Sequence, residues 1–335
     1  MDIAKFPNIY EQQKRNRRQT VIIMAAFVFF FGFLGYGFDL FMLGVDPFGL
    51  LYPEASGFPL GTVLALLAGA IFASWGLLGG AKAVLGSARA FPVPEDDPKY
   101  RTLVNIVDEM TIASGLPRPN IFIVPDPDPN AFATGKDPQN SYIAVTEGLL
   151  ERLNREELQA VIAHEMSHVK NYDIRTMTIV AALVGAIFLL SDASRRVMWF
   201  GGGGRGRRDS KGGGPVVAVL FLVWLIAMIF APLVSQILAM AVSRKREYLA
   251  DASGAELTRN PLALASALEK IESSSEPTRA IKRGSAHLCI IDPLGRKMNA
   301  REGAVADLFG THPPIQKRIM LLKGMAYAFE AQTAL

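Results

Sequence analysis

The stretch Ala160-Val-Ile-Ala-His-Glu-Met-Ser-His-Val-Lys170 places the pattern His-Glu-x-x-His inside an apolar run that permits a helix. On a helix that turns by about 100° per residue, His164 and His168 return to one face, so two imidazoles can hold one metal ion. Glu165 lies beside that face, where its carboxylate can reach a water on the metal without taking a coordination site. An incidental pair of helix histidines is the weaker interpretation, because the chain has only 4 His among 335 residues. The pattern is typical of the catalytic helix of a zinc peptidase.

A catalytic zinc ion needs a third protein ligand as well as an open coordination position. Glu247 and Asp251 lie four residues apart in the sequence, on one face of a second expected helix. Glu247 can therefore bind the metal while Asp251 orients a ligand imidazole, although an ordinary solvated pair of acidic side chains would show the same spacing. The other candidates for the third ligand are His287, His312, Asp173 and Glu256.

Two further motifs accompany these residues. Asn130-Ala-Phe-Ala-Thr-Gly135 precedes the His-Glu-x-x-His helix, and Thr311-His-Pro-Pro314 follows the Glu247 to Asp251 segment. Together with His164-Glu-Met-Ser-His-Val-Lys-Asn-Tyr-Asp-Ile-Arg175, the four motifs resemble the HtpX family of membrane-bound zinc metalloproteases, which are relatives of the CAAX prenyl endopeptidases. The resemblance runs over nearly the whole chain, including its hydrophobic segments.

The resemblance implies a set of roles for the site residues. One Zn²⁺ per chain would be bound by His164, His168 and Glu247. Glu165 would be the catalytic residue, and Asp251 would support a ligand, with His164 as the expected one. The resemblance also implies a gluzincin-like protease domain whose substrates are misfolded or damaged membrane proteins, and hence a role in quality control and the stress response.

The composition favours a membrane protein, because 50% of the residues are hydrophobic and they are concentrated in uncharged runs. About 20 consecutive apolar residues are enough to cross roughly 30 Å of hydrocarbon. The sequence therefore predicts an integral membrane protein with α-helical spans and an α+β zinc metalloprotease domain. Its expected parts are a cytoplasmic N-terminus (1–19), transmembrane helices (20–40, 57–81 and 215–242), a marginal span (176–192), a Gly/Arg-rich loop (193–214) and a protease domain in two parts (90–175 and 243–335).

The distribution of basic residues predicts the orientation of these spans. Four of them stand just before the first span: Lys14, Arg15, Arg17 and Arg18. By the positive-inside rule they place the N-terminus in the cytoplasm, and Lys82 and Arg89 return the chain there after the second span. The active site is therefore expected at the cytoplasmic face of the cell membrane. The arginines of 193–214 conflict with this rule if 176–192 crosses the membrane, because they would then lie outside. Either the rule fails at this loop and 176–192 crosses, which we prefer, or 176–192 forms part of a hairpin buried from the cytoplasmic side.

The formal charge of +4 arises from basic clusters beside the spans, which suit anionic lipid better than nucleic acid. The lipid bilayer is therefore an expected partner and nucleic acid is not. The single Cys289 excludes an intrachain disulfide, as in a reducing compartment. The stretch from His287 to Cys289 could form a metal pair, but a core strand is the better interpretation. The sequence does not indicate an oligomeric state.

The soluble part shows helical and strand patterns that alternate. Helices are expected at 99–114 and 156–171, strands at 121–124, 131–134 and 142–145, and a closing helical segment at 303–322. We predict that Asn130, Ala131, Phe132 and Ala133 form a sheet edge on which an extended peptide lies, since backbone pairing accepts many sequences. The alternative is a core strand without substrate contact.

The Thr311-His-Pro-Pro314 motif and the segment after it can be interpreted in two ways. Proline suits the first turn of a helix, so the motif works as a helix start. Alternatively, His312 or Arg318 lies near the zinc, where a donor would stabilise the tetrahedral oxyanion. The sequence does not decide between the two residues.

The predicted function is that of a membrane zinc endopeptidase acting on unfolded or damaged membrane proteins. One alternative is a specific peptide-processing protease of the CAAX prenyl endopeptidase type, which would need an enclosed intramembrane chamber that four hydrophobic segments are too few to build. The other is a non-enzymatic membrane adaptor or metal sensor, which Glu165 disfavours because such a protein has no need of a catalytic base.

Overall fold

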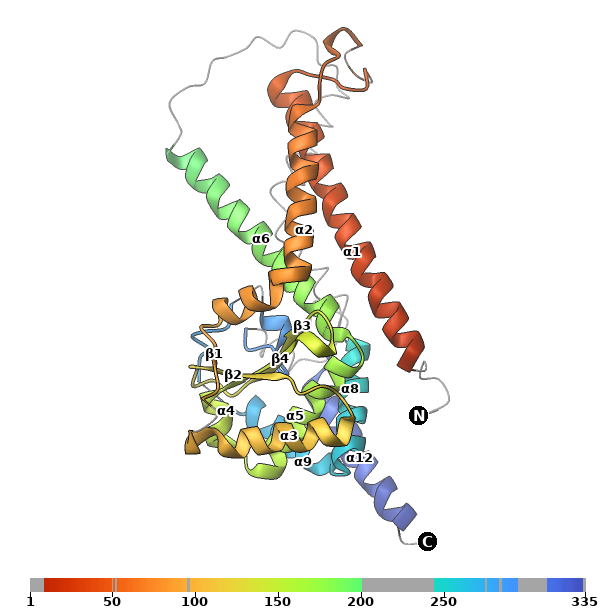
Figure 1. The fold of residues 1–335 in the computed structure, drawn as a ribbon, viewed down its shortest axis with the longest axis vertical. Coiled ribbons are helices and arrows are strands. Elements are labelled where there is room, and N and C mark those ends of the chain that lie inside the picture. The colour runs from red at the N-terminus through yellow and green to blue at the C-terminus, as the bar shows by residue number, and fades with distance from the viewer. Residues whose placement is uncertain are drawn as a thin grey trace. The chain divides into compact units, whose positions relative to one another are not determined.

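The computed structural model describes residues 9–49, 51, 53–94, 97–200, 244–274, 276–282, 285–294 and 312–333. The chain divides into two compact units. The first contains the residues up to Thr20, Leu77–Ala182 and the residues from Ile237 onward, and the second contains Val21–Gly76 and Leu183–Gln236. Figure 1 labels their helices and strands.

The first unit is built on a four-stranded sheet in the order β1-β2-β4-β3. The strands are β1 (Phe91–Pro92), β2 (Asn120–Val124), β3 (Ala131–Gly135) and β4 (Ser141–Thr146). β2 and β4 are parallel, whereas β1 and β3 are antiparallel to their neighbours. β3 therefore lies at one end of this order, and the pairing of a substrate peptide with residues 130–133 stays a prediction.

The helix that carries the His-Glu-x-x-His pattern is α5 (Arg155–Lys170), and it packs against β3 and β4. It begins with a capping box, in which the Asn154 side chain accepts from the Glu157 N–H and the Glu157 carboxylate accepts from the Asn154 N–H. Five other α-helices lie wholly within the described part of this unit: α3 (Arg101–Ser114), α4 (Glu147–Arg152), α8 (Arg244–Thr258), α9 (Pro261–Glu272) and α12 (Ile315–Thr333). α3, α8 and α9 contact α5, and α12 contacts α8 and α9 (Figure 1).

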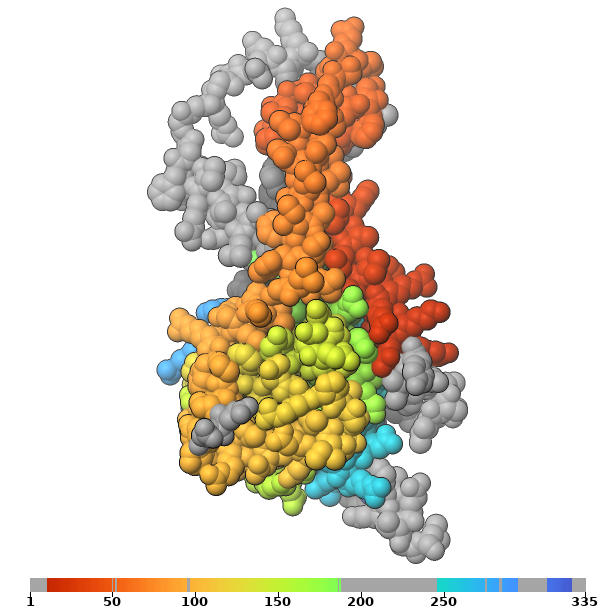
Figure 2. All heavy atoms as spheres, viewed as in Figure 1, coloured from red at the N-terminus to blue at the C-terminus, as the bar shows by residue number. Residues whose placement is uncertain are grey.

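Alternate side chains of the strands face opposite sides of the sheet, and each side has its own apolar core. On one side, Ile123, Ala133 and Ile143 join the buried residues of α3, α5, α9 and α12. On the other side, Phe132 and Ala144 pack with residues of 84–88 and 280–289. Figure 2 shows α3 (yellow) as part of a continuous surface over the first of these layers. Helix α5 is thus held from both the sheet and the helices.

The second unit contains the helices α1 (Ile9–Phe38) from Val21 onward and α2 (Leu60–Ser87) up to Gly76. They approach closely at Gly35, where a Cβ would lie 2.6 Å from the Cβ of Ala65. A π-helical turn (Asp39–Leu43) and a 3₁₀ turn (Pro53–Ala55) lie between them. The buried Asp39 carboxylate accepts hydrogen bonds of 2.7 Å from the backbone N–H groups of Gly61 and Thr62, so it caps the start of α2.

Two helices in the described part of the chain are long and apolar enough to cross a membrane, namely Glu11–Leu43 and Leu60–Ser87. They overlap the first two predicted spans. The marginal span 176–192 lies within α6 (Asp173–Phe200), and the span predicted at 215–242 lies outside the described residues.

Three local predictions differ from the structure. α6 continues to Phe200, into the predicted loop 193–214, because the first glycine of that loop is Gly201; the remainder lies outside the described residues. The stretch 287–289 is no core strand, because Ala286–Leu288 forms a 3₁₀ turn and only Cys289 makes a single bridge, to Phe132. α12 starts at Ile315, directly after two prolines, whereas the closing helix was predicted from 303; residues 295–311 lie outside the described part.

Candidate metal centre

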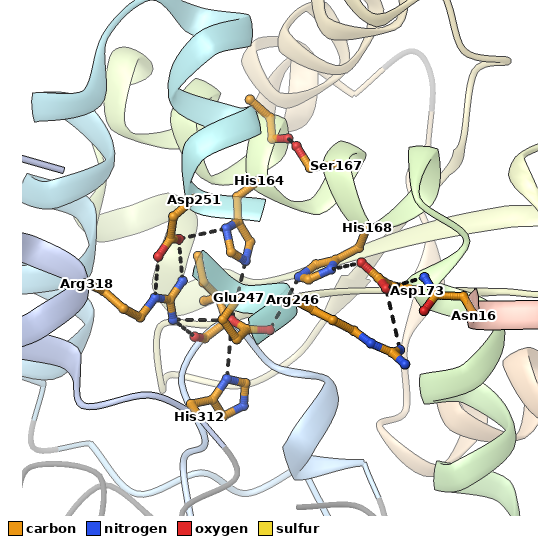
Figure 3. Close-up of polar contacts among 12 residues, drawn as sticks. Asn16, His164, Ser167, His168, Asp173, Arg246, Glu247, Asp251, His312 and Arg318 are labelled. Carbon is orange, nitrogen blue, oxygen red and sulfur yellow. Dashed lines mark hydrogen bonds and ion pairs between the residues drawn. The ribbon is translucent and has the colours of Figure 1, made fainter. Parts of the chain in front are cut away.

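The predicted metal ligands meet where α5 packs against α8. His164 and His168 project from α5 toward Glu247 on α8 (Figure 3). Gly254 permits this close approach, because a Cβ at that position would lie only 3.0 Å from the backbone nitrogen of His164. The two helices therefore bring residues that are about eighty positions apart in the sequence into one cluster.

The three side chains form a compact, buried donor set. One ligand atom from each of His164, His168 and Glu247 lies within 4.8 Å of the others. His164 Nε2 is 3.7 Å from Glu247 Oε2, and His168 Nε2 is 3.5 Å from Glu247 Oε1. Zinc bonds of about 2.0 to 2.2 Å to imidazole and carboxylate, in tetrahedral arrangement, place two donors roughly 3.4 Å apart. The observed separations match that requirement.

The far nitrogen of each imidazole faces a carboxylate. His164 Nδ1 lies 3.0 Å from Asp251 Oδ1, and His168 Nδ1 lies 3.2 Å from Asp173 Oδ2. A proton on Nδ1 serves these contacts, which leaves the Nε2 lone pairs for a metal. His164 Nε2 is buried and has no hydrogen-bond partner among the described residues. The donor set therefore fits a zinc ion, and the orienting carboxylates fit ligand histidines.

Asp251 is itself fixed by Arg318. The Arg318 Nε and Nη2 donate to the two Asp251 carboxylate oxygens at 2.8 and 2.7 Å, and Nη1 donates to the Ile290 carbonyl at 2.8 Å (Figure 3). Nη1 also lies 3.4 Å from Glu247 Oε2. Arg318 is only 1% exposed. This buried guanidinium holds the carboxylate that orients His164.

Charges around the site set the protonation of its groups. Burial lowers the pKa of His164, although Asp251 opposes the effect. Burial also lowers the pKa of His168, but the carboxylates of Asp173 and Glu247 outweigh it and raise that pKa to about 9. Burial raises the pKa of Glu247, yet His312 and Arg318 outweigh it and hold that pKa well below its usual range. Glu247 is thus anionic, and an ion bound here competes with a proton on His168.

Glu165 has the environment of a proton acceptor that works near neutral pH. It is 1% exposed, and burial raises the pKa of its carboxyl to about 7. The charge of His168 and the backbone N–H of Ala133 lower that pKa, but burial outweighs them. A general base is most effective when its pKa lies near the working pH, so Glu165 is suited to both accept and return a proton.

His312 and Arg318, the predicted oxyanion contacts, both reach the cluster. His312 is buried, and its Nδ1 lies 3.3 Å from Glu247 Oε2. Arg318 directs its nitrogens to Asp251, Glu247 and the Ile290 carbonyl. Their role toward an oxyanion stays a prediction.

The predicted substrate strand lies at the sheet edge, but the chain itself covers part of it. The Ile290 N–H donates to the Ala131 carbonyl at 2.9 Å, and Asn130 Nδ2 donates to the Ile291 carbonyl at 2.8 Å. Cys289 forms a bridge with Phe132. Residues 289–291 thus line the outer backbone of Asn130 to Phe132, and Ala133 is the next position along β3.

The remaining candidates for the third ligand lie elsewhere. Asp173 contacts the outer nitrogen of His168 rather than the ligand side. His287 Nε2 lies 3.3 Å from the Met177 carbonyl, and Glu256 is exposed. The sequence did not reveal Asp173 as the partner of His168, nor Asn16 and Arg246, which both contact Asp173. The position of Asp173 three residues after the end of α5 was the one local signal that it could contact His168.

Comparisons with known proteins show which family the chain resembles. The model of Peptidase family M48 matches residues 98–326. The protein named "Protease HtpX homolog" of Thermoanaerobacter pseudethanolicus is 42% identical over 317 residues, covering 95% of this chain and 98% of that protein. The protein of the same name from Ligilactobacillus salivarius is 40% identical over 317 residues, covering 95% of this chain and 100% of that protein.

A third relative and one solved structure extend the comparison. The "Protease HtpX homolog" of Caldanaerobacter subterraneus subsp. tengcongensis is 49% identical over 233 residues, or 70% of this chain and 75% of that protein. The crystal structure of S. mikatae Ste24p matches with a TM-score of 0.46 and 17% identity, over 85% of this chain and 63% of that one.

Proposed function

Because this chain belongs to peptidase family M48 and to its HtpX-type membrane proteases, we propose that it is a zinc-dependent endopeptidase for misfolded or damaged membrane proteins. The observation that carries the proposal is the buried cluster of His164, His168 and Glu247, whose ligand atoms lie within 4.8 Å of one another. The proposed site of cleavage is the cytoplasmic face of the cell membrane, and the proposed role is protein quality control under stress.

The chain's own residues would perform the proton transfers of peptide hydrolysis. His164, His168 and Glu247 would hold the metal, which when bound polarises the scissile carbonyl and lowers the pKa of water toward neutrality. The Glu165 carboxylate takes a proton from the attacking water and gives it to the leaving amine nitrogen as the peptide bond breaks. Asp251 and Asp173 keep the imidazoles in the tautomer that serves the metal.

The multi-pass orientation is proposed from charge. Four exposed basic side chains lie on α1 within the unit that also holds Glu165: Lys14, Arg15, Arg17 and Arg18. If these basic residues are cytoplasmic, Glu165 is cytoplasmic too. The anionic headgroups of the inner leaflet are then the lipid partners of these basic residues.

A substrate panel tests the proposal. The full chain is reconstituted in liposomes with three substrates: a destabilised membrane protein, the same protein in its stable form, and a prenylated peptide. We expect cleavage of the destabilised protein alone, and inhibition by a zinc chelator that added zinc reverses. Selective cleavage of the prenylated peptide would favour the processing enzyme. No cleavage of any of the three substrates, with or without chelator, would favour the adaptor.

A further inference from the structure

We propose that Asn16, on the N-terminal part of α1, is a positioning residue of the metal centre that acts on His168 through Asp173. The inference rests on the proposed zinc site at His164, His168 and Glu247. It makes the segment before the first span a structural part of that site, although it lies about 150 positions away in the sequence.

The contacts form one line from the helix to the ligand. Asn16 Nδ2 donates to Asp173 Oδ1 at 2.7 Å, and the other oxygen of the same carboxylate lies 3.2 Å from His168 Nδ1 (Figure 3). Asn16 is 2% exposed and Asp173 is 0% exposed. In such a buried place the carboxylate is held by protein donors rather than by bulk water, so the amide of Asn16 fixes the rotation that presents Oδ2 to the imidazole.

The same amide also fixes the backbone that carries Asp173. Asn16 Nδ2 donates a second hydrogen bond, of 2.8 Å, to the Asn171 carbonyl. This carbonyl lies in the turn between α5 and α6, where Tyr172 has a φ of 59°. One side chain thus ties the end of the active-site helix to the carboxylate that serves it.

A second group on α1 meets Asp173 indirectly. Arg246 Nη1 lies 3.5 Å from Asp173 Oδ1, and its Nη2 donates to the Gln19 side chain. Arg246 directly precedes Glu247, the proposed third ligand. Asp173 therefore contacts His168 directly and contacts Arg246, the neighbour of Glu247 in the sequence. A change in α1 that moves Asp173 would alter the position of the metal ligands.

The expected effect follows from what supporting residues do in metal sites. Loss of a carboxylate that orients a ligand histidine typically lowers metal affinity by about 10- to 100-fold. Asn16 is one contact further out, so we expect Asn16→Ala to lower zinc affinity by about tenfold. Asn16→Asp keeps the volume but replaces both donors by a carboxylate facing Asp173, so we expect a larger loss.

The test measures how fast zinc leaves the full-length protein. Detergent-purified Glu165→Gln protein, which is not expected to cleave itself, is loaded with zinc and mixed with excess chromogenic chelator. Asn16→Ala, Asn16→Asp and Asp173→Ala are compared in this background, together with the absorption spectrum of the cobalt-loaded proteins. Gln13→Ala is the matched control, because Gln13 Nε2 donates to the Lys170 carbonyl of the same turn at 2.9 Å without touching Asp173.

The double variant Asn16→Ala with Asp173→Ala tests whether Asn16 acts on the metal site through Asp173. We expect faster zinc release and an altered cobalt spectrum in both Asn16 variants, normal behaviour in Gln13→Ala, and a much smaller effect of Asn16→Ala once Asp173 is gone. Unchanged release in the Asn16 variants, or an undiminished effect without Asp173, would overturn the positioning role. If Asn16→Ala does not fold, Asn16→Asp gives the same comparison.

Failure of the proposed function gives a different result. If wild-type protein binds no zinc, the metal site itself is wrong and the positioning role falls with it. If wild-type protein binds zinc and His168→Ala releases it, while the Asn16 variants behave as wild type, only the role of Asn16 is overturned.

Discussion

Arg318 illustrates how single residues at this site depend on one another. It donates two hydrogen bonds to Asp251, lies 3.4 Å from Glu247 and is 1% exposed. Two buried carboxylates therefore share one cation. Without it, Asp251 would be a buried charge that has lost both of its hydrogen bonds to a cation.

Replacing Arg318 should destabilise the fold as well as the site. Removal of one partner from a buried ion pair typically costs about 3 to 5 kcal/mol, because the other charge remains buried. We expect Arg318→Ala to lower the free energy of unfolding in detergent by that amount, measured by chemical denaturation. Gln316→Ala, an exposed neighbour on α12, is the control and should change little. A loss of less than about 1 kcal/mol in Arg318→Ala would refute the arrangement of charges described here.

His287 should make stability depend on pH. Burial lowers its pKa to about 4 from an ordinary value of 6.5. Between these values the unfolded chain binds a proton that the folded protein does not, so the stabilisation is complete above about pH 6.5 and is lost as pH falls toward 4. The shift corresponds to about 3 kcal/mol.

The measurement compares metal-free wild type with His287→Gln, whose amide can still donate to the Met177 carbonyl. Unfolding free energies are determined in detergent between pH 7 and pH 4. We expect the wild type to lose about 3 kcal/mol more than the variant over this range. Equal slopes would show that His287 is not held neutral in the folded state.

Among the elements, β3 carries the most direct functional prediction. Thr146 N donates to the Asn130 carbonyl, so the positions hydrogen-bonded toward β4 are 130, just before β3, and 132 and 134 within it. The backbone N–H of Ala133 points to the opposite side, where it acts on the Glu165 carboxyl. A proline there removes no bond of the ladder with β4.

The Ala133→Pro variant tests whether peptides pair with this edge. We expect it to fold and bind zinc as wild type does, and to cleave unfolded protein at least tenfold more slowly, because an extended substrate loses a backbone donor and the Glu165 carboxyl loses the Ala133 N–H. Cleavage is followed by gel assay, with zinc content as the check on the site. Normal cleavage by a normally folded variant would exclude an edge-strand mode of binding.

The sequence predicted those elements whose signals are local. The helix of 156–171 and the strands at 121–124, 131–134 and 142–145 follow from periodicity, and the structure confirms them. The spacing of His164 and His168 likewise follows from one helix. The contacts of Arg318 with Asp251 and of Asn16 with Asp173 join residues 67 and 157 positions apart, and no pattern within one element encodes them.

At the scale of the whole molecule, the orientation in the membrane can be measured directly. The one cysteine, Cys289, is 0% exposed, so wild-type protein should react little with a thiol reagent. We expect Phe48→Cys, at a side chain that is 72% exposed, to be labelled by a membrane-impermeant maleimide in intact spheroplasts. Lys14→Cys should be labelled only after lysis, because its segment is proposed to be cytoplasmic. Labelling of Lys14→Cys in intact spheroplasts would show that the protein has the opposite orientation in the membrane.

The central claim is that His164, His168 and Glu247 hold a zinc ion beside Glu165, which handles the proton. Its most direct test measures zinc content and cleavage of an unfolded protein for detergent-purified wild type and Glu165→Gln side by side. We expect about one zinc per chain in both proteins and cleavage by the wild type alone, since the variant keeps the ligands and loses the base. Cleavage by Glu165→Gln at the wild-type rate, or by wild type stripped of zinc, would contradict the account.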